Sequence, residues 1–299
     1  MLGASNSLPP KILVIGGDSL IGSSLVEHFR SQGTSVEYTS RRPHHKSPAC
    51  IPLELGKAIA LPYIPEVAIL CAGVTDFRSC AEEPDATRRI NVHAVLELAA
   101  TLHLGGAHIL YLSSNAVCEI EKDSAQSHSL PPITTELGAQ KHDAERGILA
   151  LGERATVVRA TKVVSSRVPM FEGWLTCLGQ HTKIFPWSDK YFCPISLRFI
   201  AFWLAELALR HVSGVFHLSG EKLVSYSEFG IQLAASMSAE LKLVVPSTMA
   251  GAVLTNDSPP RHACLDMKLT TITLGATPQT VGSVLSDLLE EFYLTHAIG

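Results

Sequence analysis

The 299-residue sequence lacks the features that mark several large classes of protein. No apolar run reaches the roughly 18 residues of a membrane-spanning helix; the longest candidate, 199–209, is short and contains Glu206. The formal net charge is −4, and there is no basic cluster of the kind that binds nucleic acid. The polar N-terminus has no apolar core and is not a signal peptide. We therefore expect a cytoplasmic protein with neither membrane nor nucleic-acid partners.

The spacing of the cysteines and histidines also matches no known motif. The chain has 7 cysteines and no C-x-x-C pair, and its 13 histidines form no metal-binding motif. An odd cysteine count without a regular spacing is typical of a reducing compartment. We expect no metal site.

Short apolar runs, by contrast, are plentiful and alternate with helical patterns. The runs that predict strands are Lys11–Gly17, Ser35–Ser40, Val67–Gly73, His108–Ser114, Ala155–Thr161 and Gly214–Gly220. Helical spacing follows the first of them, ending near Gly33, and recurs over His93–Leu104. Near-continuous apolar strands that alternate with helices predict an α/β fold, a Rossmann-type doubly wound parallel sheet.

The alternation stops after Thr161, where prolines and tryptophans interrupt the chain. We interpret residues 10–165 as a nucleotide-binding domain and 166–211 with 241–299 as a smaller C-terminal substrate lobe. The apolar run at 214–220 indicates that the chain returns to the first domain over about 212–240.

A glycine-rich turn, Val14–Gly22, joins the first predicted strand to the first helix. Such a turn directs backbone N–H groups and a helix N-terminus at a pyrophosphate. Gly16 permits the tight turn, and Gly22 permits close packing of helix and strand. Ser19 stands where a middle glycine is expected. The position of the turn predicts dinucleotide binding; an ordinary tight turn is the alternative.

The end of the second predicted strand distinguishes between the two nicotinamide cofactors. NAD-binding folds usually place an acidic residue there for the ribose 2′-hydroxyl. This chain has Ser40, Arg41 and Arg42 instead. Two guanidinium groups beside a hydroxyl suit a 2′-phosphate, which predicts NADP(H), unless the arginines form only a solvated turn.

The order of these motifs resembles the extended short-chain dehydrogenase/reductase family, and within it the dTDP-4-dehydrorhamnose reductase-like branch that binds sugar nucleotides. The stretches that carry the resemblance are ILVIGGDSLIGSSL, CAGVTDFRSCAEEPDATRRINV, YLSSNAV, LGAQKHDAE and SPPRHACLDMKL.

The resemblance implies roles for individual residues. Ser114 matches the hydroxyl that binds the substrate carbonyl, and Lys141 matches the lysine of the active site, which also contacts the cofactor. Asn91 matches an asparagine that supports the site. The residues implied in cofactor binding are Gly16, Ser19, Leu20, Ile21, Gly22, Ser40, Arg41, Arg42, Ala72, Gly73, Asn91 and Lys141. A strand-end hydroxyl that caps nearby backbone is the alternative for Ser114.

The family's Tyr-x-x-x-Lys motif is incomplete in this chain. Leu137 occupies the position of the tyrosine that gives a proton to the carbonyl oxygen. Loss of a general acid costs about 10²–10⁴-fold in rate. The groups that might replace the phenol are Glu136, Tyr191, His142 or a water molecule, although Glu136 faces another side of its helix.

Three hypotheses therefore remain for function. The chain is an NADP-dependent enzyme of the reductase branch with altered acid–base chemistry, a non-redox enzyme of the epimerase or lyase type, or a non-catalytic NADP-binding sensor or partner subunit. The retained Ser114, Asn91 and Lys141 favour a cofactor that is used in some reaction.

The expected substrate is a small molecule, such as a nucleotide sugar. Its sugar ring could stack on aromatic residues of the predicted lobe: Trp174, Trp187, Tyr191 or Phe192. Thr75 and Arg261 are further candidates for substrate contact, the second through a phosphate. Lobe core is the alternative for the aromatic residues, and a surface ion pair for Arg261. A homodimer is possible.

Overall fold

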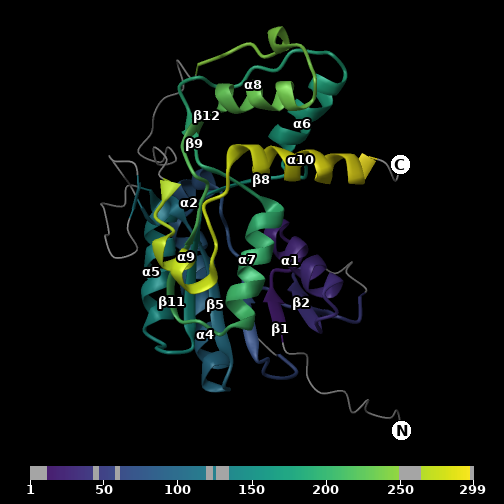
Figure 1. Ribbon diagram of the computed structural model, residues 1–299. Helices are drawn as coiled ribbons and strands as arrows, with labels where there is room; N and C mark the ends of the chain where they lie inside the picture. Colours follow the sequence, from purple (N-terminus) through teal and green to yellow (C-terminus); the bar gives the residue numbers. More distant parts are fainter. Residues whose placement is uncertain are drawn as a thin grey trace.

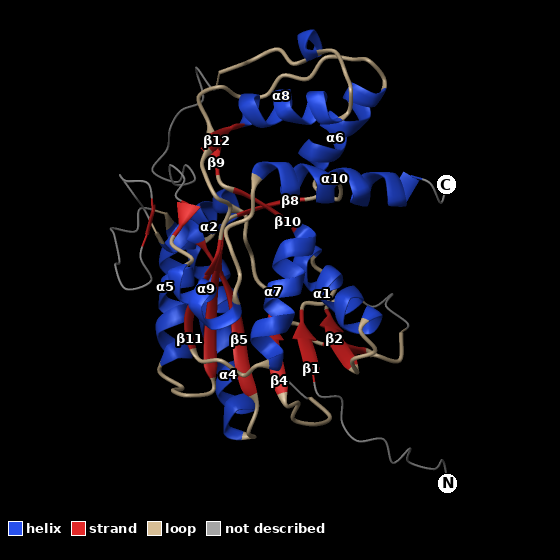
Figure 2. Ribbon diagram, in the orientation of Figure 1, coloured by secondary structure: helices blue, strands red, loops and turns tan. Residues whose placement is uncertain are grey.

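The computed structural model describes residues 12–42, 47–57, 61–118, 124–125, 135–248 and 264–296. Its centre is a seven-stranded sheet in the order β11-β7-β5-β4-β1-β2-β3, in which all neighbouring strands are parallel. The strands are β1 (Ile12–Ile15), β2 (Val36–Ser40), β3 (Cys50–Pro52), β4 (Val67–Leu70), β5 (His108–Ser114), β7 (Ala155–Ala160) and β11 (Gly214–Leu218). The sheet occupies the lower half of Figure 1 and is drawn red in Figure 2. The predicted Rossmann-type α/β fold is confirmed.

Helices cover both faces of this sheet because its strands are apolar on both sides. In β1, Ile12 and Val14 pack into one hydrophobic cluster, while Leu13 and Ile15 pack into another on the opposite face. The first face is covered by α1 (Leu20–Ser31) and α7 (Leu197–Leu209). The second is covered by α4 (Val95–Leu104) and α5 (Glu136–Leu149).

A second group of helices forms the upper part of the molecule in Figure 1. It contains α6 (Pro169–Gly179), α8 (Tyr226–Ser236) and α10 (Val281–His296), whose buried side chains form a separate hydrophobic cluster. Short strands lie beneath it: β8 (Lys162–Val164) pairs with β10 (Pro194–Ser196), and β9 (Tyr191–Phe192) pairs with β12 (Val224–Ser225). This second cluster is the core of a small lobe.

The remaining elements are short. They are α2 (Phe77–Glu82), α3 (Pro84–Arg88), the π-helix η1 (Arg89–Ala94), the 3₁₀ turns η2 (Asn115–Val117) and η3 (Leu241–Leu243), β6 (Ser124–Ala125), β13 (Cys264–Leu265) and α9 (Lys268–Leu274). None of the helices described is long and apolar enough to cross a membrane.

The boundaries predicted between domain and lobe need correction at two helices. α7 was expected in the lobe, yet its buried leucines and alanines pack against α1 and the sheet. α8 falls within the segment expected to return to the sheet, yet Phe229 and Leu233 pack with α6 and α10. Only β11 of that segment joins the sheet. Elsewhere the division into domain and lobe stays a prediction.

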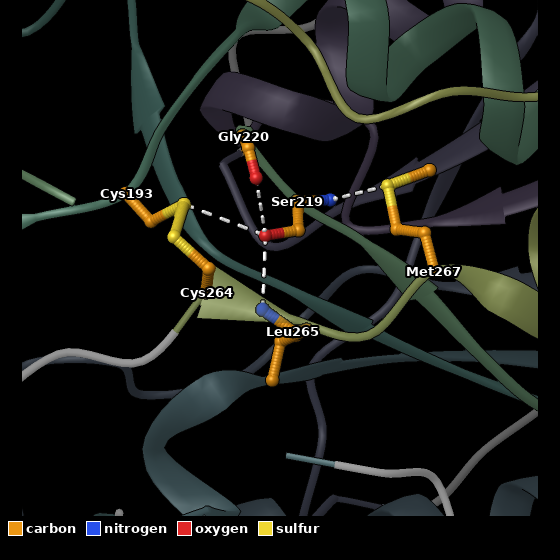
Figure 3. Close-up of a disulfide and its surroundings, with 6 residues drawn as sticks. All are labelled: Cys193, Ser219, Gly220, Cys264, Leu265 and Met267. Carbon is orange, nitrogen blue, oxygen red and sulfur yellow. Dashed lines mark hydrogen bonds between the residues drawn. A yellow bond between two sulfur atoms is a disulfide. The ribbon is translucent and has the colours of Figure 1, made fainter. Parts of the chain in front are cut away.

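A disulfide joins Cys193, just before β10, to Cys264 at the start of β13. Figure 3 shows the Ser219 hydroxyl beside it, 3.4 Å from the Cys193 sulfur, and this hydroxyl also accepts a hydrogen bond from the Leu265 N–H. The cysteine spacing gave no sign of this pair, and a disulfide is at odds with the reducing compartment expected from it. The other five cysteines are free.

Candidate functional site

The glycine-rich turn is tightly held at the N-terminus of α1. Gly16 has φ of 82°, in the left-handed region, and its N–H donates to Thr39 Oγ1 at 3.0 Å. Ser19 caps α1, because its Oγ accepts from the Gly22 N–H at 3.1 Å and donates to the Gly16 carbonyl at 2.7 Å. A Cβ at Gly22 would collide with that carbonyl oxygen. The serine in place of a middle glycine thus holds the turn closed by hydrogen bonds.

The turn opens into a cavity of about 300 Å³, here called the ribose cavity. Six residues predicted from sequence to bind cofactor besides Gly16 line it: Ser19, Ser40, Arg41, Arg42, Ala72 and Gly73. Both arginines are exposed to solvent, where a phosphate group could reach them. Glu54 and Asp18 line the same cavity.

Asp18 is a residue of this cavity that the sequence analysis did not single out. Its carboxylate accepts from the Ser40 hydroxyl at 2.9 Å and lies 3.4 Å from the Arg42 guanidinium. Ser40 Oγ in turn accepts from the Arg42 N–H at 3.0 Å. An acid does therefore stand at the end of β2, supplied by the glycine turn rather than by the strand. The signal was present in the sequence, between Gly17 and Ser19.

A larger cavity of about 530 Å³, here called the reaction cavity, lies between the sheet and the lobe. It shares Ser19, Cys71 and Gly73 with the ribose cavity, so the two are continuous around the glycine turn. The sequence-predicted residues that line it, apart from the shared ones, are Leu20, Ile21, Thr75, Ser114, Leu137 and Lys141. The structure thus gathers the predicted reactive positions at one place.

Leu137 and Lys141 lie one helical turn apart on α5, and both are buried against this cavity. The Lys141 ammonium donates to the Leu112 carbonyl at 3.0 Å and lies 4.7 Å from the centre of the Tyr111 ring. Burial lowers the pKa of Lys141 to about 8, although the Glu145 carboxylate opposes the shift. Lys141 is thus an amine that can exchange its proton near neutral pH.

A buried ion pair fixes α5 on the sheet behind these residues. Glu145 accepts two hydrogen bonds from Arg159 of β7, with Nε–Oε1 at 3.1 Å and Nη2–Oε2 at 2.7 Å. Both side chains are at most 3% exposed. Such a bidentate pair holds the helix in register with the strand.

Ser114 ends β5 at the cavity wall. Its Oγ accepts from the Ala116 N–H at 3.0 Å and so caps η2. The alternative interpretation of Ser114, as a strand-end cap, describes its observed hydrogen bond. The Ser114 hydroxyl donates only a long hydrogen bond, with its Oγ 3.4 Å from Asn115 Oδ1. The hydroxyl is therefore free to turn toward a ligand in the cavity.

Asn91 lies in the π-helix η1, behind the cavity walls rather than in them. Its Oδ1 accepts from the Val74 N–H, and its Nδ2 donates to the Val74 carbonyl and to Gln140 Oε1, each at 2.8 Å. Asn91 is not among the residues that line either cavity: its side chain is buried and joins the segment after β4 to α5, and its contact with the cofactor stays a prediction. The π-helix, a form frequent at functional sites, turns the amide to both partners.

Five other candidates are absent from the lining of the reaction cavity: Glu136, His142, Trp174, Trp187 and Tyr191. Glu136 begins α5 but accepts from Arg88 at 3.3 Å and from Gln140 at 3.0 Å. Trp174 packs in the lobe core, against Phe171. Tyr191 is 45% exposed and is not part of the cavity lining, since alternate side chains of β9 face opposite ways. Arg261 lies outside the described residues.

The lobe and its short strands contribute Lys162, Val163, Lys190, Phe192 and Tyr226 to the cavity, and only Phe192 was among the aromatic candidates. Tyr226 stacks on Phe192 with ring centres 4.2 Å apart, and burial raises its pKa to about 12. Lys162 and Lys190 also line the cavity. No pattern in the sequence connects these lysines, because the strand pairing of the lobe brings them together.

The fold and the place of these two cavities are those of an extended short-chain dehydrogenase/reductase. More narrowly, residues 10–294 match the family model of the RmlD substrate binding domain, and the chain belongs to that family. This agrees with the resemblance drawn from the motifs.

Two relatives have low sequence identity to this chain but match it over nearly its whole length. One is the probable low-salt glycan biosynthesis reductase Agl14 of Haloferax volcanii, 26% identical over 297 residues, with 93% of this chain and 97% of the relative covered. Another is methionine adenosyltransferase 2 subunit beta of Pongo abelii, 23% identical, with 91% and 85% covered.

Two solved structures share the fold. The dTDP-4-dehydrorhamnose reductase of Bacillus anthracis in complex with NADP has a TM-score of 0.79 at 16% identity, covering 96% of this chain and 100% of that one. MoeE5 in complex with UDP-glucose and NAD has a TM-score of 0.78 at 18% identity, covering 97% and 100%.

Proposed function

We propose that the protein binds NADP(H) across its two joined cavities and uses it on a nucleotide sugar or a similar activated carbonyl or hydroxyl substrate, by acid–base chemistry without a tyrosine. The observation that carries the proposal is the common lining of one cavity by Ser114, Leu137 and Lys141, continuous with the glycine turn and Arg41-Arg42. The division into cofactor domain and substrate lobe is part of this proposal.

The residues present fit a nicotinamide dinucleotide. A Cβ at Gly16 would collide with Ala72, and one at Gly22 with the Gly16 carbonyl, so the turn requires glycine at both positions. The α1 N-terminus beside them favours a pyrophosphate. Arg41 and Arg42 would hold a 2′-phosphate. The two structural neighbours are complexes with NADP and with NAD, so the choice of NADP(H) rests on the arginines of this chain.

When bound, NADPH supplies a hydride to a carbonyl carbon. Ser114 would donate a hydrogen bond to the carbonyl oxygen, and that oxygen then needs a proton. Leu137 has none to give. Lys141 does, and its pKa of about 8 makes the transfer feasible near neutral pH. We assign the proton transfer to Lys141, with a rate below that of a tyrosine-based site because the same amine also neighbours the cofactor.

A second candidate function is a non-catalytic, NADP-binding partner subunit. Leu137 favours it, and so does the relationship to proteins named as subunit beta of methionine adenosyltransferase 2. A non-redox enzyme on the same fold is the remaining alternative. In both cases the ribose cavity binds NADP(H) and no net NADPH oxidation occurs.

The test compares the unmodified protein with Leu137→Tyr and the matched Leu137→Phe, which adds the ring without the hydroxyl. NADPH binding is measured by calorimetry, and NADPH oxidation is followed with keto-sugar nucleotides. We expect NADPH to bind all three proteins. Oxidation by the unmodified protein should be about 10²–10⁴-fold slower than the per-second rates usual for enzymes. Leu137→Tyr should raise it by about 10-fold or more, and Leu137→Phe should not.

Three outcomes would decide against the proposal. Absence of NADPH binding would remove the cofactor assignment. Turnover near a per-second rate in the unmodified protein would mean that a group other than Lys141 replaces the phenol efficiently. Binding without any turnover, in the unmodified protein and in Leu137→Tyr alike, would leave the partner subunit or the non-redox enzyme.

A further inference from the structure

The reaction cavity has an uneven distribution of charge. Three lysines line it, Lys141, Lys162 and Lys190, and the part of its lining that the structure describes contains no aspartate or glutamate. Asp189 neighbours Lys190 in the chain and raises its pKa, but it is not among the lining residues. The cavity therefore presents positive charge to a ligand with no carboxylate on its walls to neutralise it.

Lys162 and Lys190 form one subsite. Both side chains line the reaction cavity, and the pKa of Lys162 is lowered first by burial and then by the charge of Lys190. Lys162 begins β8, which pairs with β10, and Lys190 directly precedes β9. The Lys190 ammonium lies 5.0 Å from the centre of the Trp187 ring, a cation–π contact that limits where the side chain can reach.

The subsite lies close to the reacting end of the cavity. Ser114 pairs with Ala160 in the β5–β7 register, and Lys162 follows Ala160 by two residues. Thr161, between them, has a buried hydroxyl with no hydrogen-bond partner among the described residues. Asp189 beside Lys190 relieves part of the repulsion between two cations on one cavity wall, and a bound anion would relieve it further.

We propose that Lys162 and Lys190 bind a negatively charged group on the sugar of the substrate, near the carbon that reacts, so that the preferred substrate is a nucleotide-linked sugar acid. The inference rests on the proposed function and specifies its substrate class. The diphosphate of a nucleotide sugar offers the same anionic oxygens. The place of Lys162 two residues beyond the partner of Ser114 favours the sugar, where a carboxylate would lie beside the reacting carbon.

The test measures the binding of UDP, UDP-glucose and UDP-glucuronate by calorimetry with saturating NADP. UDP-glucuronate should bind about 10-fold more tightly than UDP-glucose, as expected for one charge-assisted contact. Lys162→Met and Lys190→Met should each reduce that preference toward equality. Lys242→Met is the matched control, because Lys242 pairs with Glu240 on the lobe surface, and it should keep the preference.

Each other outcome overturns the inference. An equal loss of affinity for UDP, UDP-glucose and UDP-glucuronate in Lys162→Met would assign the lysines to the diphosphate. Equal binding of the two sugars by the unmodified protein, including no binding of either, would remove the subsite. NADPH is titrated into separate samples that contain no NADP: a protein that binds it without any sugar preference fails this inference alone, whereas one that does not bind it fails the proposed function.

Discussion

The two joined cavities differ in how they balance charge. In the ribose cavity acidic side chains accompany the cations: Arg42 lies beside Asp18, and Glu54 lines the same wall. In the reaction cavity the described lining contains lysines and no carboxylate. A balanced, exposed site costs little when it is empty, whereas cations that share one wall repel each other. From this difference we expect the selectivity of the proposed function to lie at the lobe side, and each prediction below probes one part of the comparison.

The largest effect is expected where the cavities meet. Gly22→Val would drive the new side chain into the Gly16 carbonyl and the Ser19 hydroxyl, 2.8 Å from its Cβ, and displace the turn. Overpacking of this kind should weaken NADPH binding by about 100-fold. Calorimetry measures it, with Gly173→Val as control because a Cβ there meets no atom within 4 Å. Undiminished binding would reduce the glycine turn to a structural connection.

The next effect concerns the cations of the ribose cavity. Arg41→Ala combined with Arg42→Ala should weaken NADPH by about 10–100-fold, the cost of charged hydrogen bonds to one phosphate, and leave NADH within a few-fold. Arg210→Ala, which removes an exposed arginine paired with Glu206, is the control. A parallel loss for both nucleotides would show that these arginines do not read the 2′-phosphate.

A smaller effect is expected from Lys141. Its folded pKa, about 8, lies below that of an unfolded lysine, so the unfolded chain binds more protons between the two values. The free energy of unfolding should therefore rise with pH through this range, by about 1 kcal/mol between about pH 7 and pH 9. Urea unfolding of the unmodified protein and of Lys141→Met at both pH values checks this. The free energy of unfolding of the unmodified protein, taken relative to that of Lys141→Met, should be higher at the higher pH than at the lower. An equal difference at both pH values would contradict the lowered pKa of Lys141.

The smallest effect is expected from Asp18. Asp18→Asn keeps an acceptor for Ser40 and removes one negative charge beside Arg42. NADPH affinity should rise by about 2–5-fold, the size of an exposed charge interaction, while NADH should not gain. Titration of both nucleotides at low and high salt measures it, since salt should reduce the gain. A loss of NADPH affinity would mean that Asp18 chiefly positions Arg42.

The parallel sheet and the place of the glycine turn could be predicted because their signals are local. Each strand is a short apolar run, and a turn between the first strand and the first helix can lie only at the carboxyl edge of the sheet. Ser114 and Lys141 follow from motif spacing. Arg41 and Arg42 follow from the end of β2, but the role of NADP(H) stays a prediction.

What could not be predicted depends on contacts between distant segments. α7 is apolar along most of its length, so its pattern does not say whether sheet or lobe covers it. Lys162 lies in β8 and Lys190 directly precedes β9. Nothing local in the sequence says that Trp174 packs in the lobe core and that Tyr191 is exposed. Cys193 and Cys264 are 71 residues apart with nothing in their spacing to connect them.

That last separation makes part of the chain a covalent ring. With its two ends joined, the segment from β10 through α7, β11 and α8 to β13 loses much of the freedom of an open chain when it unfolds. For a loop of 71 residues the chain-entropy model gives about 4 kcal/mol of stabilisation. The ring includes strand β11 of the sheet and helix α8 of the lobe. Reduction of this one disulfide would therefore lower the stability of the sheet and of the lobe together.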